Sequence, residues 1–459
     1  MYNTYYDYLL QKNAVSGAVM KPSTNLPCII IPGMGHSKLE LYRGGEKVKT
    51  VWPLKTDARE AAKRVRLPYL KTVLSRRDRG FTDAIGGYFR DVLEPLTTLP
   101  DGGMRHEIRP VAREYPLSRF TEGEKRFTYR LAPVRELAGT IGEENIYLFA
   151  YNFFTDLYES AARLDRFIQT VKARSGAEQV RLLPVSMGGA VFTAYLDAYG
   201  EKNDAAQVMF IEAGLDGSVL MSDLFRRNVD KYNGYSVLEF ATSGRVSEAM
   251  RRLLAPVPWE VRFGVLYKSL DAAFDTVLNN SLAMWATVPK EDYPALRDRY
   301  LSGEARAAFR EKLERFLAAQ FRVRELIAER QRAGAAFYAT SGYGLRIMAL
   351  SANDTVSTDT VLAAYSTSLG AMTAPRGQTL DPAVLTPDSR VSPDGAIDAS
   401  TGFLKDATWF FKGQVHNDTA FNDTIQTLVR RVFTDPAFHD VFSDPAFPQF
   451  IEAEDSRKK

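Results

Sequence analysis

The segment from Gln179 to Gly200 constrains the fold most strongly, because a short apolar run in it ends at a serine. The run up to Pro184 is mostly apolar, as expected of a strand buried on both faces. Ser186 follows, then two glycines, and then a helix-forming stretch. This order predicts a strand, a sharp turn and a helix, with the serine hydroxyl at the edge of a sheet. A serine that merely caps the helix of a βα turn is the alternative.

Strands and helices alternate in the same part of the chain. Between residues 145 and 214, three apolar runs are separated by helical patterns, which predicts right-handed βαβ units and a parallel sheet. Similar runs occur before and after, at Cys28–Ile31, Leu345–Ser351 and Ala407–Gly413. We therefore predict an α/β fold with a mostly parallel central sheet flanked by helices.

The other segments divide the chain around this sheet. After residue 214 the alternation stops, and a mostly helical stretch interrupted by prolines predicts a cap over the carboxyl edge of the sheet. The predicted parts are an N-terminal arm (1–25), a first core part (26–214, with an insertion at 36–144), a helical cap or lid (215–340) and a second core part (341–459, with a loop excursion at 370–406).

Composition excludes several classes of function. The formal net charge of the 459 residues is +3, from 59 basic and 56 acidic side chains, which argues against a nucleic-acid-binding protein. Cys28 is the only cysteine and there are 4 histidines, so we predict neither a disulfide framework nor a metal or other cofactor. The sequence shows neither a membrane-spanning apolar run nor a signal-peptide pattern, which predicts a cytoplasmic protein, with a non-standard export route left open.

Three polar residues follow three different predicted strands: Ser186, Asp354 and His416. The carboxyl ends of parallel strands meet at one edge of a sheet. A serine hydroxyl becomes a good nucleophile when a neutral imidazole takes its proton and a carboxylate orients that imidazole. We predict these residues as a catalytic triad, although Asn353-Asp354 also suits a plain Asx turn. Asp359 is the rival acid, but it lies deeper in the next helical pattern.

The loop after the first strand is predicted to complete the site. Pro32-Gly33 allows a close backbone approach to a ligand, and is otherwise a plain turn. The backbone N–H groups of Met34 and Met187 are the predicted oxyanion donors. Gly33 and His36 are placed to contact substrate.

Two further features bear on the substrate. Trp259 and Trp285, in the predicted cap, either line an apolar acyl pocket or belong to the cap's own core. A basic stretch at residues 63–79 either contacts an anionic lipid surface or forms a solvated helix face.

The segment around Ser186 resembles the G-x-S-x-G nucleophile elbow of α/β-hydrolases, with Pro184 in place of the first glycine. More of the chain resembles the lecithin:cholesterol acyltransferase family, which includes phospholipid:diacylglycerol acyltransferases, a lysosomal phospholipase and many bacterial hydrolases. The segments that carry this resemblance are IIIPGMGHSKLEL, NIYLFAYNFF through VSMGGAVFTAYL, FIEAGLDGS, SANDTV and VHNDTAFND. The resemblance implies an α/β-hydrolase fold with a cap, with Ser186, Asp354 and His416 as the triad and Met34 in the oxyanion loop.

The sequence departs from the family's pattern in three places. Pro184-Val185 precedes the serine where the family has Gly-His. Residues 151–154 read Tyr-Asn-Phe-Phe where the family often has Tyr-Asp-Trp-Arg, and the lone Cys28 provides no disulfide-clipped lid. The resemblance therefore does not imply a secreted lipoprotein role, and it leaves acyl transfer open.

These observations support one leading hypothesis and two alternatives. The leading hypothesis is a serine-dependent lipid ester hydrolase or O-acyltransferase that works through an acyl-enzyme and contacts a lipid or other acyl ester, with peripheral contact to a membrane surface possible. The alternatives are a catalytically silent binding protein on the same fold and an esterase of a polar substrate. The oligomeric state is open.

Overall fold

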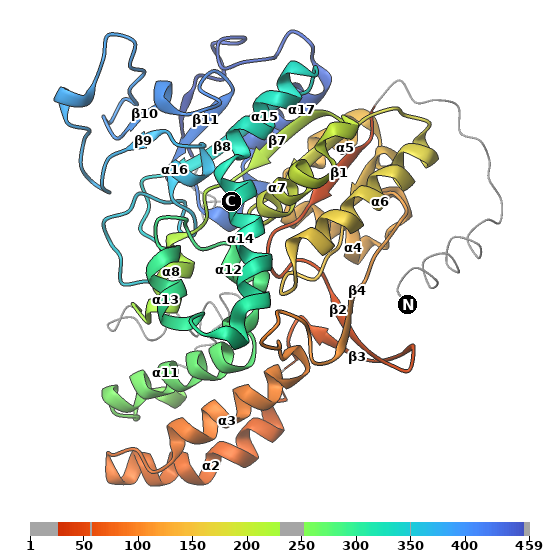
Figure 1. The fold of residues 1–459 in the computed structure, drawn as a ribbon. Coiled ribbons are helices and arrows are strands. Elements are labelled where there is room, and N and C mark those ends of the chain that lie inside the picture. The colour runs from red at the N-terminus through yellow and green to blue at the C-terminus, as the bar shows by residue number, and fades with distance from the viewer. Residues whose placement is uncertain (1–25, 56, 230–251, 349, 454–459) are drawn as a thin grey trace.

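A seven-stranded parallel sheet forms the centre of the molecule (Figure 1). The structure is a computed structural model and describes residues 26–55, 57–229, 252–348 and 350–453; the predicted N-terminal arm (1–25) lies outside them. The strands are β1 (Cys28–Ile31), β5 (Ile146–Leu148), β6 (Val180–Pro184), β7 (Ala205–Ile211), β8 (Ala336–Tyr343), β11 (Thr408–Lys412) and β12 (Phe450–Glu452). Their order is β12-β11-β8-β7-β6-β1-β5, and every neighbouring pair is parallel. The predicted α/β fold is confirmed, and it is α/β-hydrolase-like.

Helices cover both faces of this sheet, which explains why most residues of its central strands are buried whichever face they point to. Ile29 and Ile31 of β1 face one hydrophobic core, and their neighbours Cys28 and Ile30 face the other. The first core is closed by α6 (Leu157–Ser175), α7 (Gly188–Tyr199), α14 (Ala307–Phe321) and α15 (Val323–Arg332). The second is closed by α5 (Arg135–Ile141) and α17 (Asp423–Thr434).

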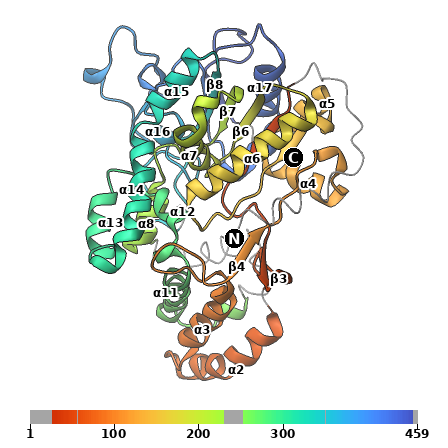
Figure 2. The same cartoon turned by 45° about the vertical axis from the view of Figure 1, so that its right-hand side comes forward.

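The predicted insertion builds a second small sheet and most of a helical arm. The small sheet is antiparallel and consists of β2 (Leu39–Arg43), β3 (Glu46–Trp52) and β4 (Glu107–Pro110). The arm consists of α2 (Ala58–Ser75), α3 (Phe81–Leu93) and α11 (Trp259–Thr276), with α3 packed against both of the others. In Figures 1 and 2 these three helices lie together at one end of the molecule, away from the central sheet. The insertion also supplies α4 (Glu122–Leu131).

The prediction of a strand at residues 345–351 is wrong, because the chain forms strand β8, which begins nine residues earlier. β8 is bounded by Gly334 and Gly344, which have φ angles of 98° and 87°, values that favour glycine. Leu345 only makes an isolated antiparallel bridge to Thr358. The cap boundary predicted at residue 340 therefore falls inside β8, and α14 and α15 of the predicted cap pack directly on α7.

The remaining α-helices and strands of the described ranges are short. They are α8 (Val219–Arg226), α12 (Leu282–Ala286), α13 (Tyr293–Tyr300), α16 (Ala364–Thr367), β9 (Met372–Thr373) and β10 (Ile397–Asp398). β9 and β10 pair within the predicted loop excursion at 370–406. Within the described ranges, no helix combines the length and apolarity that a membrane span needs.

Candidate active site

Ser186 occupies a sharp turn between β6 and α7. Its φ angle is 53°, which is left-handed backbone for a residue other than glycine, and its N–H donates to the carbonyl of Ile211 at 3.1 Å. The turn leaves no room for a side chain at residue 188, where an added Cβ would overlap the carbonyl oxygen of Ile31. The glycine that follows the serine by two positions is thus required by packing, as in a nucleophile elbow.

Pro184, which replaces the first glycine of that motif, is accommodated in β6. The N–H groups of Val180 and Ser186 both donate toward β7, and amides alternate in direction along a strand. Residue 184 would therefore also direct its N–H at β7, and proline has none. The paired residues of β6 and β7 run to Leu182 and resume at the bridge from Val185 to Ile211. Pro184 interrupts the sheet ladder and leaves the turn at the serine intact.

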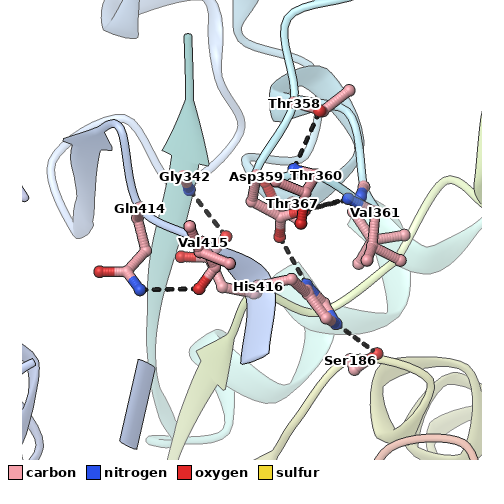
Figure 3. A network of polar contacts seen from close by, with 12 residues as sticks. Ser186, Gly342, Thr358, Asp359, Thr360, Val361, Thr367, Gln414, Val415 and His416 are labelled. Carbon is pink, nitrogen blue, oxygen red and sulfur yellow. Dashed lines mark hydrogen bonds and ion pairs between the residues drawn. The ribbon is translucent and has the colours of Figure 1, made fainter. Parts of the chain in front are cut away.

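A chain of hydrogen bonds runs from Ser186 through a histidine to an aspartate, and these two residues lie in the segments that follow two other strands (Figure 3). His416 Nε2 lies 2.9 Å from Ser186 Oγ, and His416 Nδ1 lies 2.6 Å from Asp359 Oδ2. Asp359 is fully buried, and Val361 and Leu362 donate backbone N–H groups to its Oδ1 at 2.8 and 2.7 Å. In this arrangement the imidazole can accept the serine proton while the carboxylate fixes its orientation.

The prediction of Asp354 as the acid is therefore wrong in geometry, and the rival Asp359 occupies the position. Asp354 is exposed, and its carbonyl oxygen accepts a hydrogen bond from Arg376 Nε at 2.9 Å. Next to it, Asn353 Oδ1 accepts the N–H groups of Thr355 and Val356, which is the Asx turn left open above. The error follows from the misplaced strand, because the segment after β8 brings Asp359, and not Asp354, to His416.

The loop after β1 lies against the serine, as predicted. A Cβ added at Gly33 would sit 2.9 Å from Ser186 Cβ and 3.3 Å from its Oγ. Tyr151 is fully buried, and its hydroxyl donates to the Pro32 carbonyl at 2.9 Å, which fixes the loop. Among the described residues, the N–H groups of Met34 and Met187 donate to no protein acceptor. Both amides are thus available as oxyanion donors.

His36 lies beside this loop with its ring largely buried. Its Nδ1 has no hydrogen-bond partner among the described groups, and its ring meets Phe127 edge-on at 6.3 Å between centroids. Burial, and then the charge of His416 when protonated, lower the pKa of His36 to about 4. The ring is neutral at physiological pH, so it presents a polar atom near the serine without adding a positive charge.

The two tryptophans predicted near the substrate have other surroundings. Trp285 is fully buried against Phe225, with ring centroids 4.2 Å apart, and its Nε1 donates to the Asn279 carbonyl at 3.1 Å. Trp259 begins α11 in the helical arm and is 38% exposed. Neither tryptophan makes a hydrogen bond or a ring contact with Ser186, His416 or Asp359.

Sequence reasoning missed one acidic residue of this region. Glu212 follows β7 directly, is buried, and accepts the N–H of Gly342 at 2.7 Å. Its signal in the sequence is an acid at the end of an apolar run, Met-Phe-Ile-Glu-Ala-Gly, which also describes an ordinary solvated strand end. Within the described residues, no cluster of three or more His, Cys, Asp or Glu side chains is arranged to hold a metal ion.

Comparison with known proteins adds little. No protein-family model matches the chain, and no curated protein matches it. Among solved structures it is similar to a lipase-esterase related protein from Clostridium acetobutylicum, at 12% identity over 47% of this chain and 91% of that one, with a TM-score of 0.18. A likeness this weak supports no argument about the chemistry of the site, which is therefore argued from the geometry of the site alone.

The tight turn predicts opposite effects of two glycine-to-alanine changes. Gly188→Ala forces a methyl group into the Ile31 carbonyl and should destabilise the protein by about 2 kcal/mol or more. Gly139→Ala is the control, because Gly139 is exposed within α5 and an added Cβ meets nothing within 4 Å; it should stabilise by roughly 0.5–1 kcal/mol. Urea unfolding measures both, and equal stability of the two variants would contradict the packing described here.

Proposed function

We propose that this protein is a serine-dependent ester hydrolase or acyltransferase that acts on esters with apolar acyl chains. The observation that carries the proposal is the chain of hydrogen bonds from Ser186 through His416 to Asp359. It joins a serine at a strained turn, an imidazole and a buried carboxylate, in the contact order that acyl transfer needs. This set of contacts favours an enzyme over the silent binding protein that the Pro184 departure had suggested.

In the proposed reaction, Ser186 Oγ attacks the ester carbonyl while its proton passes to His416 Nε2. Asp359 stabilises the imidazolium that forms, and the N–H groups of Met34 and Met187 receive the negative charge on the carbonyl oxygen. The carbon–oxygen ester bond then breaks, and the leaving alkoxide takes the proton from His416. This gives an acyl-enzyme and a free alcohol.

The second half of the reaction sets the choice between hydrolysis and transfer. His416 removes a proton from water or from an acceptor hydroxyl, which attacks the acyl-enzyme, and Ser186 recovers its proton as it leaves. Water gives a carboxylic acid, and an alcohol gives a new ester. The resemblance to the lecithin:cholesterol acyltransferase family supports a lipid alcohol as one possible acceptor.

Two aspartate variants test this assignment. Asp359→Asn should lower kcat on a soluble p-nitrophenyl ester by on the order of 10³–10⁴-fold, because the amide cannot stabilise the imidazolium. Asp354→Asn is the matched control and should change kcat by less than about twofold, since the residue is exposed and away from His416. Parent-like turnover by Asp359→Asn would contradict the proposed triad, and an inactive, folded parent would favour the binding protein.

Exposed apolar side chains near the site support an apolar substrate. Met34 follows the loop that touches the serine, Phe127 on α4 meets His36, and Phe421 ends the same short helical turn that begins with His416. All three are exposed to solvent, and α4 packs against the turn that carries His416. Large apolar groups held in water around a reactive serine favour an acyl chain over a sugar or peptide.

The helical arm offers a matching surface for lipid. Leu67, Leu70 and Leu74 lie on one side of α2, and Leu74 is 84% exposed. Exposed basic side chains surround them on the same helix and its end: Lys63, Arg66, Lys71, Arg76 and Arg77. Leucines flanked by cations favour a bilayer with anionic headgroups, where each cation contributes about 1 kcal/mol. We propose that the protein reaches its substrate at such a surface.

Placing negative charges among the leucines of this face tests both the membrane contact and the substrate class. The parent should sediment with vesicles that contain anionic lipid and should prefer long-chain over acetyl or butyryl esters. The double change Leu70→Glu and Leu74→Glu should lower hydrolysis of vesicle-embedded esters by about tenfold or more, without affecting a soluble short-chain ester. Val384→Glu, at an exposed site outside the arm, is the control. A parent that prefers acetyl esters and ignores vesicles would support the esterase of a polar substrate.

A further inference from the structure

A second carboxyl group is buried behind the proposed catalytic acid. Glu212 directly follows β7, between the elbow strand β6 and β8 in the sheet order. Its backbone is held in left-handed conformation with a φ angle of 42°, and its N–H donates to Thr340 Oγ1 on β8 at 3.3 Å. Only 1% of the residue is accessible to solvent, so the side chain points into the protein and not into water.

The neighbours of this side chain place it against Asp359. Glu212 Oε2 accepts the N–H of Gly342 at 2.7 Å. A Cβ added at Gly342 would lie 2.8 Å from Asp359 Cβ, so Gly342, whose N–H binds the Glu212 carboxyl group, lies directly beside Asp359. Glu212 Oε1 is buried and has no hydrogen-bond donor facing it among the described groups.

Burying a carboxylate oxygen without a hydrogen-bond partner destabilises the folded protein, and a proton on that oxygen removes its negative charge. Burial, and then the negative charge of Asp359, raise the pKa of Glu212 well above its ordinary value. Oε2 already accepts from Gly342, so a proton on this carboxyl group would sit on Oε1. A protonated carboxyl group is a hydrogen-bond donor, and it needs an acceptor close by.

Asp359 has one acceptor position left for such a donor. An ionised carboxylate accepts about four hydrogen bonds, and three come from Val361, Leu362 and His416. Asp359 is also the titratable group that acts on Glu212 through its charge and through a side-chain hydrogen bond. A protonated Glu212 would therefore find its acceptor at the fourth position of Asp359, and that position would gain a donor.

We propose that Glu212 is a positioning residue of the active site, which carries a proton on Oε1 and donates it in a hydrogen bond to the Asp359 carboxylate. This bond holds Asp359 in the orientation in which its Oδ2 meets His416 Nδ1. The inference rests on the proposed function, since the orientation matters for turnover only if His416 acts as the base. Neither a hydrogen bond nor an ion pair joins Glu212 to Ser186 or His416.

Two substitutions separate donation of a hydrogen bond from mere filling of space. Glu212→Gln keeps an acceptor for Gly342 and supplies an amide N–H in place of the O–H, so kcat should stay within about threefold of the parent. Glu212→Leu has a similar volume and no donor, so kcat should fall by about 10–100-fold, as for other groups that orient an active-site ligand. KM should be unchanged in both, because neither variant alters a group that meets substrate.

The proton itself is measured independently of turnover. Infrared difference spectra of the parent against Glu212→Gln should show, at neutral pH, the carbonyl stretch of a protonated carboxylic acid that the variant lacks. Absence of this band would overturn the proposal, as would a Glu212→Gln variant as slow as Glu212→Leu, or a folded leucine variant with parental kcat. If the leucine variant does not fold, the glutamine variant and the infrared band decide. A parent that shows the band and hydrolyses no ester would overturn the proposed function and not the state of Glu212.

Discussion

The turn at Ser186 depends on a close approach of α7 to β1 that only a glycine at residue 188 permits. The carbonyl oxygen of Ile31 occupies the space that a side chain at residue 188 would need, so without a side chain there α7 can begin against β1. The serine is then confined to a left-handed backbone conformation, which costs on the order of 1–3 kcal/mol, while its N–H is tied to Ile211. The hydroxyl consequently stands at the carboxyl edge of the sheet, where the loops after β8 and β11 arrive.

The charged and polar groups at this edge suit the transfer of one proton in the proposed reaction. Asp359 is fully buried, and its carboxylate is tolerable there because backbone amides and the imidazole of His416 bond to it. His36 stays neutral because burial lowers its pKa, so the protonated form of His416 meets no second cation. On the other side, burial raises the pKa of Glu212, and the proton proposed there spares Asp359 a second anion. In the proposed reaction, the proton therefore moves along the hydrogen bond from Ser186 to His416.

Much of this architecture could be predicted from the sequence, because it rests on short-range patterns. Continuous apolar runs marked most strands, and the strand–serine–glycine–helix order marked the elbow in spite of Pro184. The acid was assigned wrongly because Leu345–Ser351 is as apolar as a buried strand, whereas β8 contains Thr340, Ser341 and Gly342. Such small and polar residues are buried there by contacts with distant segments, which local periodicity does not report.

The same limit explains the tryptophans and the buried glutamate. An aromatic residue on a predicted helix has the same local pattern whether it lines a pocket or fills a core, and Trp285 fills a core through contact with Phe225. Glu212 ends a strand as many solvated acids do. Its burial results from the neighbouring β8 and from Asp359, which lies 147 residues away in the chain, so only the folded structure shows it.

The claim that Ser186 is a nucleophile activated by His416 is tested most directly by covalent labelling. The folded parent is treated with a fluorophosphonate, which forms a stable phosphonyl ester with an activated serine, and the modified peptide is located by mass spectrometry. The account predicts one adduct, on the peptide that contains Ser186, and its loss in His416→Ala under the same conditions. An unlabelled parent, or labelling that persists at Ser186 at the same rate without the histidine, would contradict it.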